Sequence, residues 1–577
     1  MLLAMAILAG LALAVGTAGA GEISSRTYTL DADFDEGSAI INVVHSIPDQ
    51  LQLDETTSAF PFIWVAASDR GTIVKIDTDT GDILGEYQSA PDGRGRNPSR
   101  TTVDKSGNVW SGNRNESSGG KGSVVQVGLE ENGQCEDRNT NGVIDTSTGL
   151  GDIKPWTNDG GADDNGGVST AEDECIIKYV RVEGDNIRHV SVDANNDVWT
   201  AGNFGSDNAF DLVDGDTGAI LASFDVGCGG YGGLVDGNGV LWSANRGPGS
   251  DRLLRYDTKN TVTTGDDTSA CLTASNSYGL GIDSNGNIWH SQFTSNTILK
   301  FQPDGTLFAG FPKTTGGASG DRGVAVTAAD DNVWVANSSG SDVSRLDNDG
   351  NVLKVIPVGD GPTGVAVDAA GKVWATNRNS DDVSRIDPAT DTVDLTVDLG
   401  DGAGPYNYSD MTGAILVGAP DNGTWTVVYD SGIEGAEWGT VSWTADVVGD
   451  GSLNVTVRSS EDGVTFGPSE AVTDGADITV ADGKFLQVSA SFTRAGTGES
   501  PILFDLTVAT VGEEATPTPT PSPTPTAVAE VIQLPTTGGT PSDGGSGALP
   551  WLAAVAGAIA LIGSGSAWFA YQRRRIR

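Results

Sequence analysis

Positive charge is scarce in this sequence. The 577 residues include 33 Lys and Arg against 78 Asp and Glu, which gives a formal net charge of −45. Because such a field repels phosphate backbones, the composition argues against nucleic acid as a partner and favours divalent cations. Histidine is rarer still, since the chain contains only three copies, His45, His189 and His290. A chain this poor in histidine has few groups suited to acid–base chemistry near neutral pH.

The two long apolar runs of the chain lie at its ends. Residues 1–20 close on Ala18-Gly19-Ala20, which is typical of a secretory signal peptide and too short to span a bilayer. Residues 548–572 are long enough to cross the ~30 Å hydrocarbon core as one transmembrane helix. The basic tail, residues 573–577, is expected in the cytoplasm before any processing. The bulk of the chain is therefore predicted on the outer face of the cell, anchored to the membrane or cell wall.

A short motif precedes the C-terminal run. Leu534, Pro535, Thr536, Thr537 and Gly538 resemble the LPxTG sorting signal of sortase substrates. In that family a sortase cuts the Thr–Gly bond, here 537–538, and joins the Thr carboxyl to a cell-surface amine. Attachment by sortase and a helix that simply stays in the membrane both remain open, because the polar gap 539–547 is longer than usual. The motif lies in a Pro/Thr-rich stalk, residues 512–547, of extended polyproline character.

A repeat fills the middle of the chain. Its form is G-x-x-V-D-x-x-G-x-V-W-x-x-N, as in GVAVDAAGKVWATN at 364–377, where two alternating strands flank a tight turn. The repeated tryptophans are Trp64, Trp110, Trp199, Trp242, Trp289, Trp334 and Trp374, at spacings of 46, 89, 43, 47, 45 and 40 residues. This period predicts an all-β fold, a seven-bladed β-propeller of four-stranded blades over residues 56–413, with the tryptophans packed between blades.

The first unit lacks an inner strand, and an unpaired strand-like segment follows the last unit. That segment, residues 406–413, has no tryptophan behind it. We expect it to complete the first blade and close the ring, because an open ring would leave bare sheet edges.

The repeat resembles those of NHL-type and virginiamycin B lyase-like propellers over about residues 60–413. The lyase resemblance implies a Mg²⁺-assisted ring-opening elimination by His and Glu on the propeller face. Here only His189 and His290 fall in repeats, about two blades apart and without an adjacent acidic partner. We therefore expect the fold to transfer and assign no catalytic residue.

The long spacing between Trp110 and Trp199 indicates an acidic insertion at about 130–177. Asp137, Asn139, Asn141 and Asp145 occupy positions one, three, five and nine of an EF-hand-type loop, and Gly142 takes the sixth. The pattern predicts a structural Ca²⁺ site. The twelfth position is Thr148, so a carboxylate from 163–165 or 172–174 would have to complete the ligand set. The alternative is an acidic, solvated loop.

Four cysteines in an exported chain favour two disulfides. Cys135 and Cys175 bracket the insertion, while Cys228 and Cys271 each precede an inner strand of consecutive blades. We predict these two pairs, because no C-x-x-C spacing supports a zinc site.

Loops that enter the inner strands and loops that leave the tryptophan strands share one face of a propeller. On that face the sequence places a partial ring of Arg and Tyr: Arg114, Arg188, Tyr231, Arg246, Tyr278, Arg322 and Arg378. Such a ring suits an anionic or carbohydrate-like ligand through charge-assisted hydrogen bonds and stacking. The alternative is that each arginine pairs with a nearby aspartate.

After residue 413 the repeat stops, and alternating strands over 414–511 predict a β-sandwich. The leading functional hypothesis is a cell-surface, non-enzymatic binding protein whose partner is a glycan or anionic polymer. An extracellular lyase or hydrolase of the virginiamycin B lyase kind and a structural envelope component are the alternatives.

Overall fold

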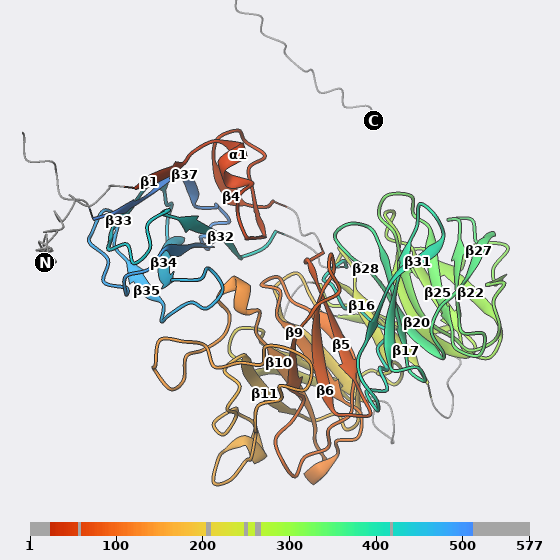
Figure 1. Cartoon of the computed structure of the whole chain (residues 1–577). Helices are drawn as coiled ribbons and strands as arrows, with labels where there is room; N and C mark the ends of the chain where they lie inside the picture. The colour runs from red at the N-terminus through yellow and green to blue at the C-terminus, as the bar shows by residue number, and fades with distance from the viewer. Residues whose placement is uncertain are drawn as a thin grey trace, which may run out of the picture. The chain divides into compact units, whose positions relative to one another are not determined.

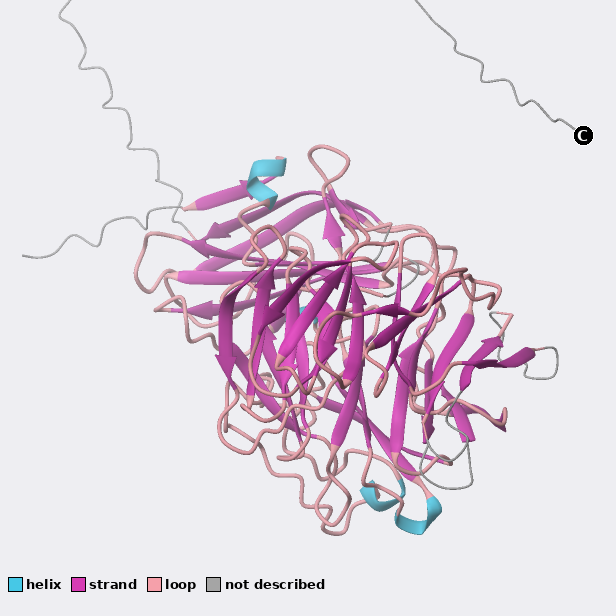
Figure 2. Ribbon diagram, turned by 90° about the vertical axis from the view of Figure 1, so that its right-hand side faces the viewer, coloured by secondary structure: helices cyan, strands magenta, loops and turns pink. Residues whose placement is uncertain are grey.

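A computed structural model describes residues 24–55, 59–202, 209–246, 252–259, 267–415 and 419–511. Strands dominate these residues, and the helices are single short turns (Figure 2). None of the described helices is long and apolar enough to cross a membrane. The predicted signal peptide, stalk with its LPTTG motif, transmembrane helix 548–572 and basic tail all lie outside the described residues.

Seven antiparallel sheets follow one another through the middle of the described chain, in the pattern of a β-propeller (Figure 1). Six have four strands in sequence order and one has three. The first sheets are β5 (Phe62–Ala67), β6 (Thr72–Asp77), β7 (Ile83–Gln88); β8 (Pro98–Val103), β9 (Val109–Asn113), β10 (Gly122–Val127), β11 (Ile176–Val182); β12 (Ile187–Val192), β13 (Val198–Gly202), β14 (Ala209–Val213), β15 (Ile220–Asp225). The next are β16 (Gly232–Val235), β17 (Val240–Asn245), β18 (Arg252–Asp257), β19 (Thr268–Thr273); β20 (Ser277–Ile282), β21 (Ile288–Gln292), β22 (Thr297–Phe301), β23 (Lys313–Thr314). The last are β24 (Asp321–Val326), β25 (Val333–Asn337), β26 (Asp342–Leu346), β27 (Val352–Pro357); β28 (Pro362–Val367), β29 (Val373–Asn377), β30 (Asp382–Asp387), β31 (Thr392–Asp398).

In five of the seven units the repeated Asp accepts a hydrogen bond from the repeated Trp, whereas Trp334 donates to the Thr327 hydroxyl. Asp368 accepts the indole N–H of Trp374 at 2.7 Å, and its other oxygen accepts the backbone N–H of Lys372 at the turn. The guanidinium of Arg385 lies 5.7 Å from the Trp374 ring centroid. Equivalent Asp–Trp bonds join residues 104 and 110, 193 and 199, 236 and 242, and 283 and 289. All seven repeated tryptophans are buried, so the residues of the repeat motif form both a turn and a core contact.

Residues 406–412 run beside the three-stranded sheet. The backbone N–H of Trp64 donates to the carbonyl of Met411 at 2.9 Å, and that of Phe60 donates to Thr412 at 2.8 Å. On the opposite side, the Thr412 hydroxyl donates to the Val367 carbonyl of β28 at 2.6 Å. The segment has no regular strand geometry, yet it bonds to the first sheet and to the last one.

The β-sandwich is larger than its predicted range, 414–511. Its two sheets have the orders β2-β32-β36-β34-β35 and β1-β37-β4-β3, with β33 paired to β37. Figure 1 shows the red β1 beside the blue β37. The strands are β1 (Ser25–Tyr28), β2 (Ala39–Ile41), β3 (Val43–Val44), β4 (Leu51–Leu53), β32 (Asn422–Asp430), β33 (Trp438–Asp446), β34 (Ser452–Ser460), β35 (Glu470–Val472), β36 (Phe485–Thr493) and β37 (Ile502–Thr510).

The sandwich is therefore built from both ends of the described chain, with the propeller inserted between β4 and β32. The four N-terminal strands have two to four residues each, which is too short to show an alternating pattern. A helical turn, α1 (Asp31–Phe34), joins β1 to β2 and buries Phe34 against Trp425 of β32. Residues up to 516 form one compact unit with these cores.

Both predicted disulfides are present. Cys135–Cys175 closes the insertion, which lies between β10 and β11 and carries two 3₁₀ turns, η2 (Glu130–Asn132) and η3 (Asp163–Asn165). Cys228 is bonded to Cys271. The placement of Cys271 corrects the reasoning for the second pair. It lies within β19, the outer strand of the sheet that begins with β16, rather than in a loop before an inner strand.

Candidate functional site

Irregularities at the starts of the inner strands create the candidate site. The pairing register shifts at the first residues of β8, β12, β20, β24 and β28, between each inner strand and its neighbour. Arg100, Arg188, Tyr278 and Arg322 lie at or inside these shifts. A β-bulge re-aims a side chain without moving the rest of the strand. Here the bulges bring cationic and aromatic side chains together at one end of the inner strands.

Four tyrosines form the floor of this end. Tyr231, Tyr278, Tyr406 and Tyr408 are all buried, and their rings contact one another with centroids 5.0 to 5.9 Å apart. The hydroxyls of Tyr231, Tyr278 and Tyr406 form a hydrogen-bonded triangle. Arg322 Nη1 donates to the hydroxyls of Tyr406 at 2.7 Å and Tyr278 at 2.5 Å.

Half-buried arginines surround the tyrosines, and together they make what we call the arginine mouth. The Arg114 guanidinium lies 4.3 Å from the Tyr406 ring centroid, and that of Arg378 lies 5.5 Å from it. The remaining guanidinium–ring distances are 5.3 Å for Arg188 over Tyr231, 5.0 Å for Arg246 over Tyr278 and 5.1 Å for Arg322 over Tyr406. Contacts of this kind contribute about 0.5–1 kcal/mol each at exposed sites and more when desolvated.

Arg100 lies deepest and closes the mouth from below. It is 1% exposed and its guanidinium is 3.2 Å from the Tyr408 ring centroid. Nη1 donates to the Tyr408 carbonyl at 3.1 Å, and Nη2 donates to the carbonyl of Tyr231. Burial lowers the pKa of Arg100, while the surrounding tyrosines counteract that effect.

The arginines alter the ionisation of Tyr406. Burial alone would raise the pKa of this phenol, but Arg322, hydrogen bonds from Tyr231 and Tyr278, and Arg188 lower it to about 7. Tyr278 behaves in the opposite way, because burial and its tyrosine neighbours raise its pKa well above the ordinary value. The mouth therefore stabilises a negative charge at its centre, on the Tyr406 oxygen.

One carboxylate, that of Asp69, pairs with two arginines of the arginine mouth. Asp69 lies 3.1 Å from Arg378 and 3.6 Å from Arg114, and its side chain is 43% exposed. An exposed ion pair of this kind is worth little, so an anionic ligand could compete with it.

The structure brings all seven predicted residues of the propeller face into this one cluster: Arg114, Arg188, Tyr231, Arg246, Tyr278, Arg322 and Arg378. Sequence reasoning missed Arg100, Tyr406 and Tyr408. Arg100 lies inside the register shift at the start of β8, and Tyr406 and Tyr408 lie in the irregular closing segment. A shift of one residue exchanges the two faces of a strand, and a bulge makes that shift invisible in the sequence.

The two repeat histidines lie in the propeller wall. His189 contacts Ser243 Oγ at 3.0 Å and Ser191 Oγ at 2.9 Å, while His290 contacts the Gly279 carbonyl at 2.9 Å. Both are fully buried, and burial lowers their pKa values to about 3 and about 4. These hydrogen bonds join the two histidines to hydroxyl and carbonyl groups, whereas the lyase resemblance implies a histidine paired with an acid.

The Ca²⁺-like loop is tightly closed. Asp137 accepts the backbone N–H groups of Asn141 at 3.1 Å and Gly142 at 2.8 Å. The two oxygens of Glu174 accept the backbone N–H groups of Asn139 and Asp145, so the second acidic stretch does return to this loop. Asn139, Asp145, Glu172 and Glu174 line one surface pocket. Among the described residues, no group of three or more His, Cys, Asp or Glu is arranged to hold a metal ion.

Comparison with known proteins gives partial matches. Over 140 residues the chain is 28% identical to a virginiamycin B lyase of Nocardia farcinica, which covers 24% of this chain and 44% of that protein. The chain therefore aligns with less than half the length of that relative. No protein-family model matches it.

Two solved structures illustrate the structural similarity. Virginiamycin B lyase of Staphylococcus aureus has a TM-score of 0.37 at 15% identity, covering 55% of this chain and 92% of that one. A periplasmic gluconolactonase of Pseudomonas aeruginosa has a TM-score of 0.41 at 15% identity, covering 60% and 97%. These similarities assign the chain to no family.

Proposed function

We propose that this chain is a cell-surface-anchored, non-enzymatic binding protein whose arginine mouth takes an anionic ligand, such as an acidic glycan or another anionic cell-envelope polymer. The convergence of five half-buried arginines on a tyrosine floor carries the proposal. The chain as a whole has a net charge of −45, so this local concentration of cations runs against its composition. Arginine forks suit carboxylate and sulfate groups.

In this proposal the propeller has seven blades, and residues 406–413 close the ring. Met411 accepts a hydrogen bond from Trp64 in the first sheet and Thr412 donates one to Val367 in the last sheet, and these bonds support that closure. The closing segment also supplies Tyr406 and Tyr408, so closing the ring completes the mouth.

Surface attachment is the second part of the proposal. The C-terminal run would insert as a helix, and the LPTTG motif would be a sortase substrate. Mass spectrometry of cell-wall digests tests this directly. A peptide ending at Thr537 linked to a wall fragment supports sortase attachment, whereas an intact C-terminus in the membrane fraction supports a retained helix.

A structural Ca²⁺ ion is the third part. Asp137, Asn139, Asn141 and Asp145 would hold it, with Glu174 completing the set in place of Thr148. Glu174 already bonds to both ends of the loop, which supports that substitution. The ion would stabilise the insertion rather than take part in ligand binding.

Two alternatives remain distinguishable. A lyase or hydrolase of the virginiamycin B lyase kind would turn over a cyclic ester substrate, and a structural envelope component would bind no soluble polymer. The partial sequence match to a lyase motivates the first alternative. Asp69 at the rim motivates the second, because it begins to pair off the arginines.

The test is a binding screen of residues 21–511 against acidic, neutral and sulfated glycans and cell-envelope polymers. We expect saturable binding to acidic polymers that weakens with salt. Replacing Arg114 and Arg378 together with Gln should weaken it roughly tenfold or more, because each loses a charge-assisted bond of about 1.5–3 kcal/mol before solvent screening. Arg458→Gln is the matched control, since Arg458 stacks on Phe466 in the sandwich at 5.4 Å. Binding that survives the double substitution, or no binding at all, would refute the proposal.

A further inference from the structure

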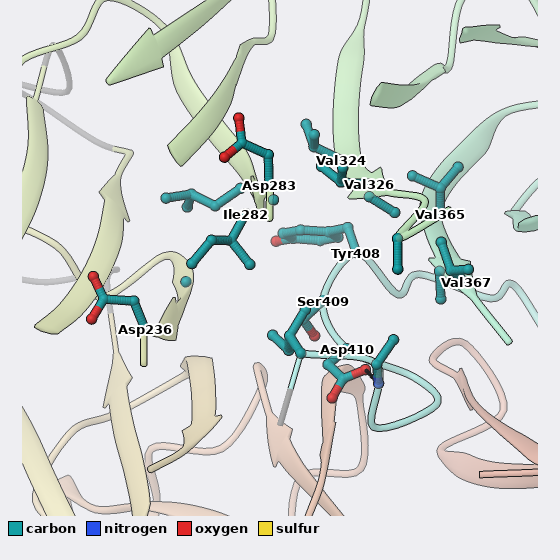
Figure 3. Close-up of a pocket in the computed structure, with 18 of the residues that line it drawn as sticks. Asp236, Ile282, Asp283, Val324, Val326, Val365, Val367, Tyr408, Ser409 and Asp410 are labelled. Carbon is teal, nitrogen blue, oxygen red and sulfur yellow. Dashed lines mark hydrogen bonds between the residues drawn. The ribbon is translucent and has the colours of Figure 1, made fainter. Parts of the chain in front are cut away.

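A second cavity lies at the other end of the inner strands. It has a volume of about 280 Å³, and the Tyr408 ring and Arg100 separate it from the arginine mouth. Its walls are the inner strands β16, β20, β24 and β28 together with residues 408–415. Figure 3 shows the Tyr408 ring in the middle of this cavity, among Ile282, Val324 and Val365.

Aliphatic side chains make the inner surface. The inner strands contribute aliphatic residues to the lining of the cavity. These residues are Leu280, Ile282, Val324, Val326, Val365 and Val367. Ile282 and Val326 are partly exposed although they lie in inner strands, which indicates that they border open space.

Most of the charged groups around the cavity are engaged by the protein, although the second carboxyl oxygen of Asp410 is buried without a hydrogen-bond partner. Figure 3 shows the carboxyl groups of Asp236 and Asp283 directed away from the Tyr408 ring. Their partners explain this orientation: Asp236 accepts the Trp242 indole at 3.0 Å, and Asp283 pairs with Lys300 at 3.2 Å. Asp331 accepts the backbone N–H of Ser284 at 2.9 Å, Asp410 accepts that of Gly413 at 2.9 Å, and Arg100 donates to two carbonyls.

We infer that this cavity is a binding site for a small, uncharged, apolar or aromatic molecule. An ionic ligand would lose its hydration against these aliphatic walls, and the four carboxylates disfavour anions such as fatty acids. Cavities of about 150 Å³ with aliphatic walls accept benzene, so 280 Å³ suits a body of roughly two to three rings. The site is independent of the arginine mouth, because the Tyr408–Arg100 pair lies between them.

A pair of fluorescent probes tests this inference. N-phenyl-1-naphthylamine is neutral, and 8-anilinonaphthalene-1-sulfonate is nearly the same molecule with an added sulfonate. The chain ending at Thr516 is used, because the compact unit lies within that range. We expect one saturable site for the neutral probe and at least tenfold weaker binding of the sulfonate.

Substitutions locate the site. Val326→Phe would fill the cavity and should weaken the neutral probe at least tenfold, whereas Val352→Phe, at a position 37% exposed on β27, should leave it unchanged. Val326→Thr keeps the side-chain shape and should weaken binding of the neutral probe about threefold. This variant provides the test if Val326→Phe does not fold. Equal binding of both probes, no saturable binding, or binding unaffected by Val326→Thr in a folded chain would overturn the inference.

Discussion

The carboxyl of Asp321 gives a stability prediction whose size follows from the structure. Asp321 begins β24, next to Arg322, and is fully buried. The pKa of this carboxyl is raised to about 7, chiefly by burial and further by Asp342. The Thr315 hydroxyl, which donates a hydrogen bond to it at 2.9 Å, acts in the opposite direction. The native state therefore keeps a proton that the unfolded chain releases near its ordinary pKa of 3.8.

The sign of the effect follows from linkage. Between pH 3.8 and 7 the native state binds more protons than the unfolded state, so the free energy of unfolding falls as the pH rises. A shift of about three pKa units corresponds to roughly 4 kcal/mol, as an upper bound, lost across this window. Asp321→Asn removes the titration. We expect the variant to gain stability over the wild type by about 2–4 kcal/mol between pH 4 and 8.

Urea unfolding of residues 21–511 at pH 4, 5, 6, 7 and 8, followed by tryptophan fluorescence, measures this difference. Asp462→Asn is the control, because backbone hydrogen bonds at an exposed turn lower the pKa of Asp462 to about 2. Its effect should be constant above pH 5. A difference between Asp321→Asn and wild type that does not change with pH would refute the reasoning.

Two further predictions concern the mouth and the insertion. Binding of an acidic polymer should weaken as the pH rises from 6 to 8.5, because Tyr406, with a pKa of about 7, gains a negative charge. Tyr406→Phe should flatten this dependence of affinity on pH. An equally steep dependence in wild type and variant would contradict the prediction. Adding Ca²⁺ to chelator-treated protein should raise the melting temperature measured by calorimetry. Asp145→Asn should abolish this rise, whereas Asp152→Asn, which lies outside the proposed ligands, should retain it. Equal responses of the two variants would show that Asp145 is not a ligand.

Much of the propeller could be predicted from the sequence, because its repeat combines two structural requirements. A turn that needs Asp and a core that needs Trp recur together, so spacing alone predicted blades whose tryptophans are buried. The disulfide pairs followed from which segments the cysteines bracket. The Arg and Tyr positions followed from their place before or after strands, which required no knowledge of contacts.

What the sequence did not reveal depends on long-range pairing. Strands β1, β2 and β4 have no pattern of their own, because their faces are defined by partners more than 350 residues away. Arg100 and Tyr406 were missed for a local reason, since a bulge or an irregular segment turns each side chain by one position. The apolar cavity was not predicted at all, because it arises where four inner strands fail to fill the space around Tyr408.

The insertion of the propeller within the sandwich imposes an order on folding during synthesis. Ser25 pairs with Ala509, so the first strand to be made must wait for the last. The propeller can close much earlier, and the bond from Phe60 to Thr412 then holds its two ends together. Once the propeller has folded, the N-terminal and C-terminal strands of the sandwich are joined by a short effective loop instead of several hundred unfolded residues. The entropy cost of pairing these strands is therefore lower. A chain cut short before β37 would therefore have a complete propeller and an incomplete sandwich.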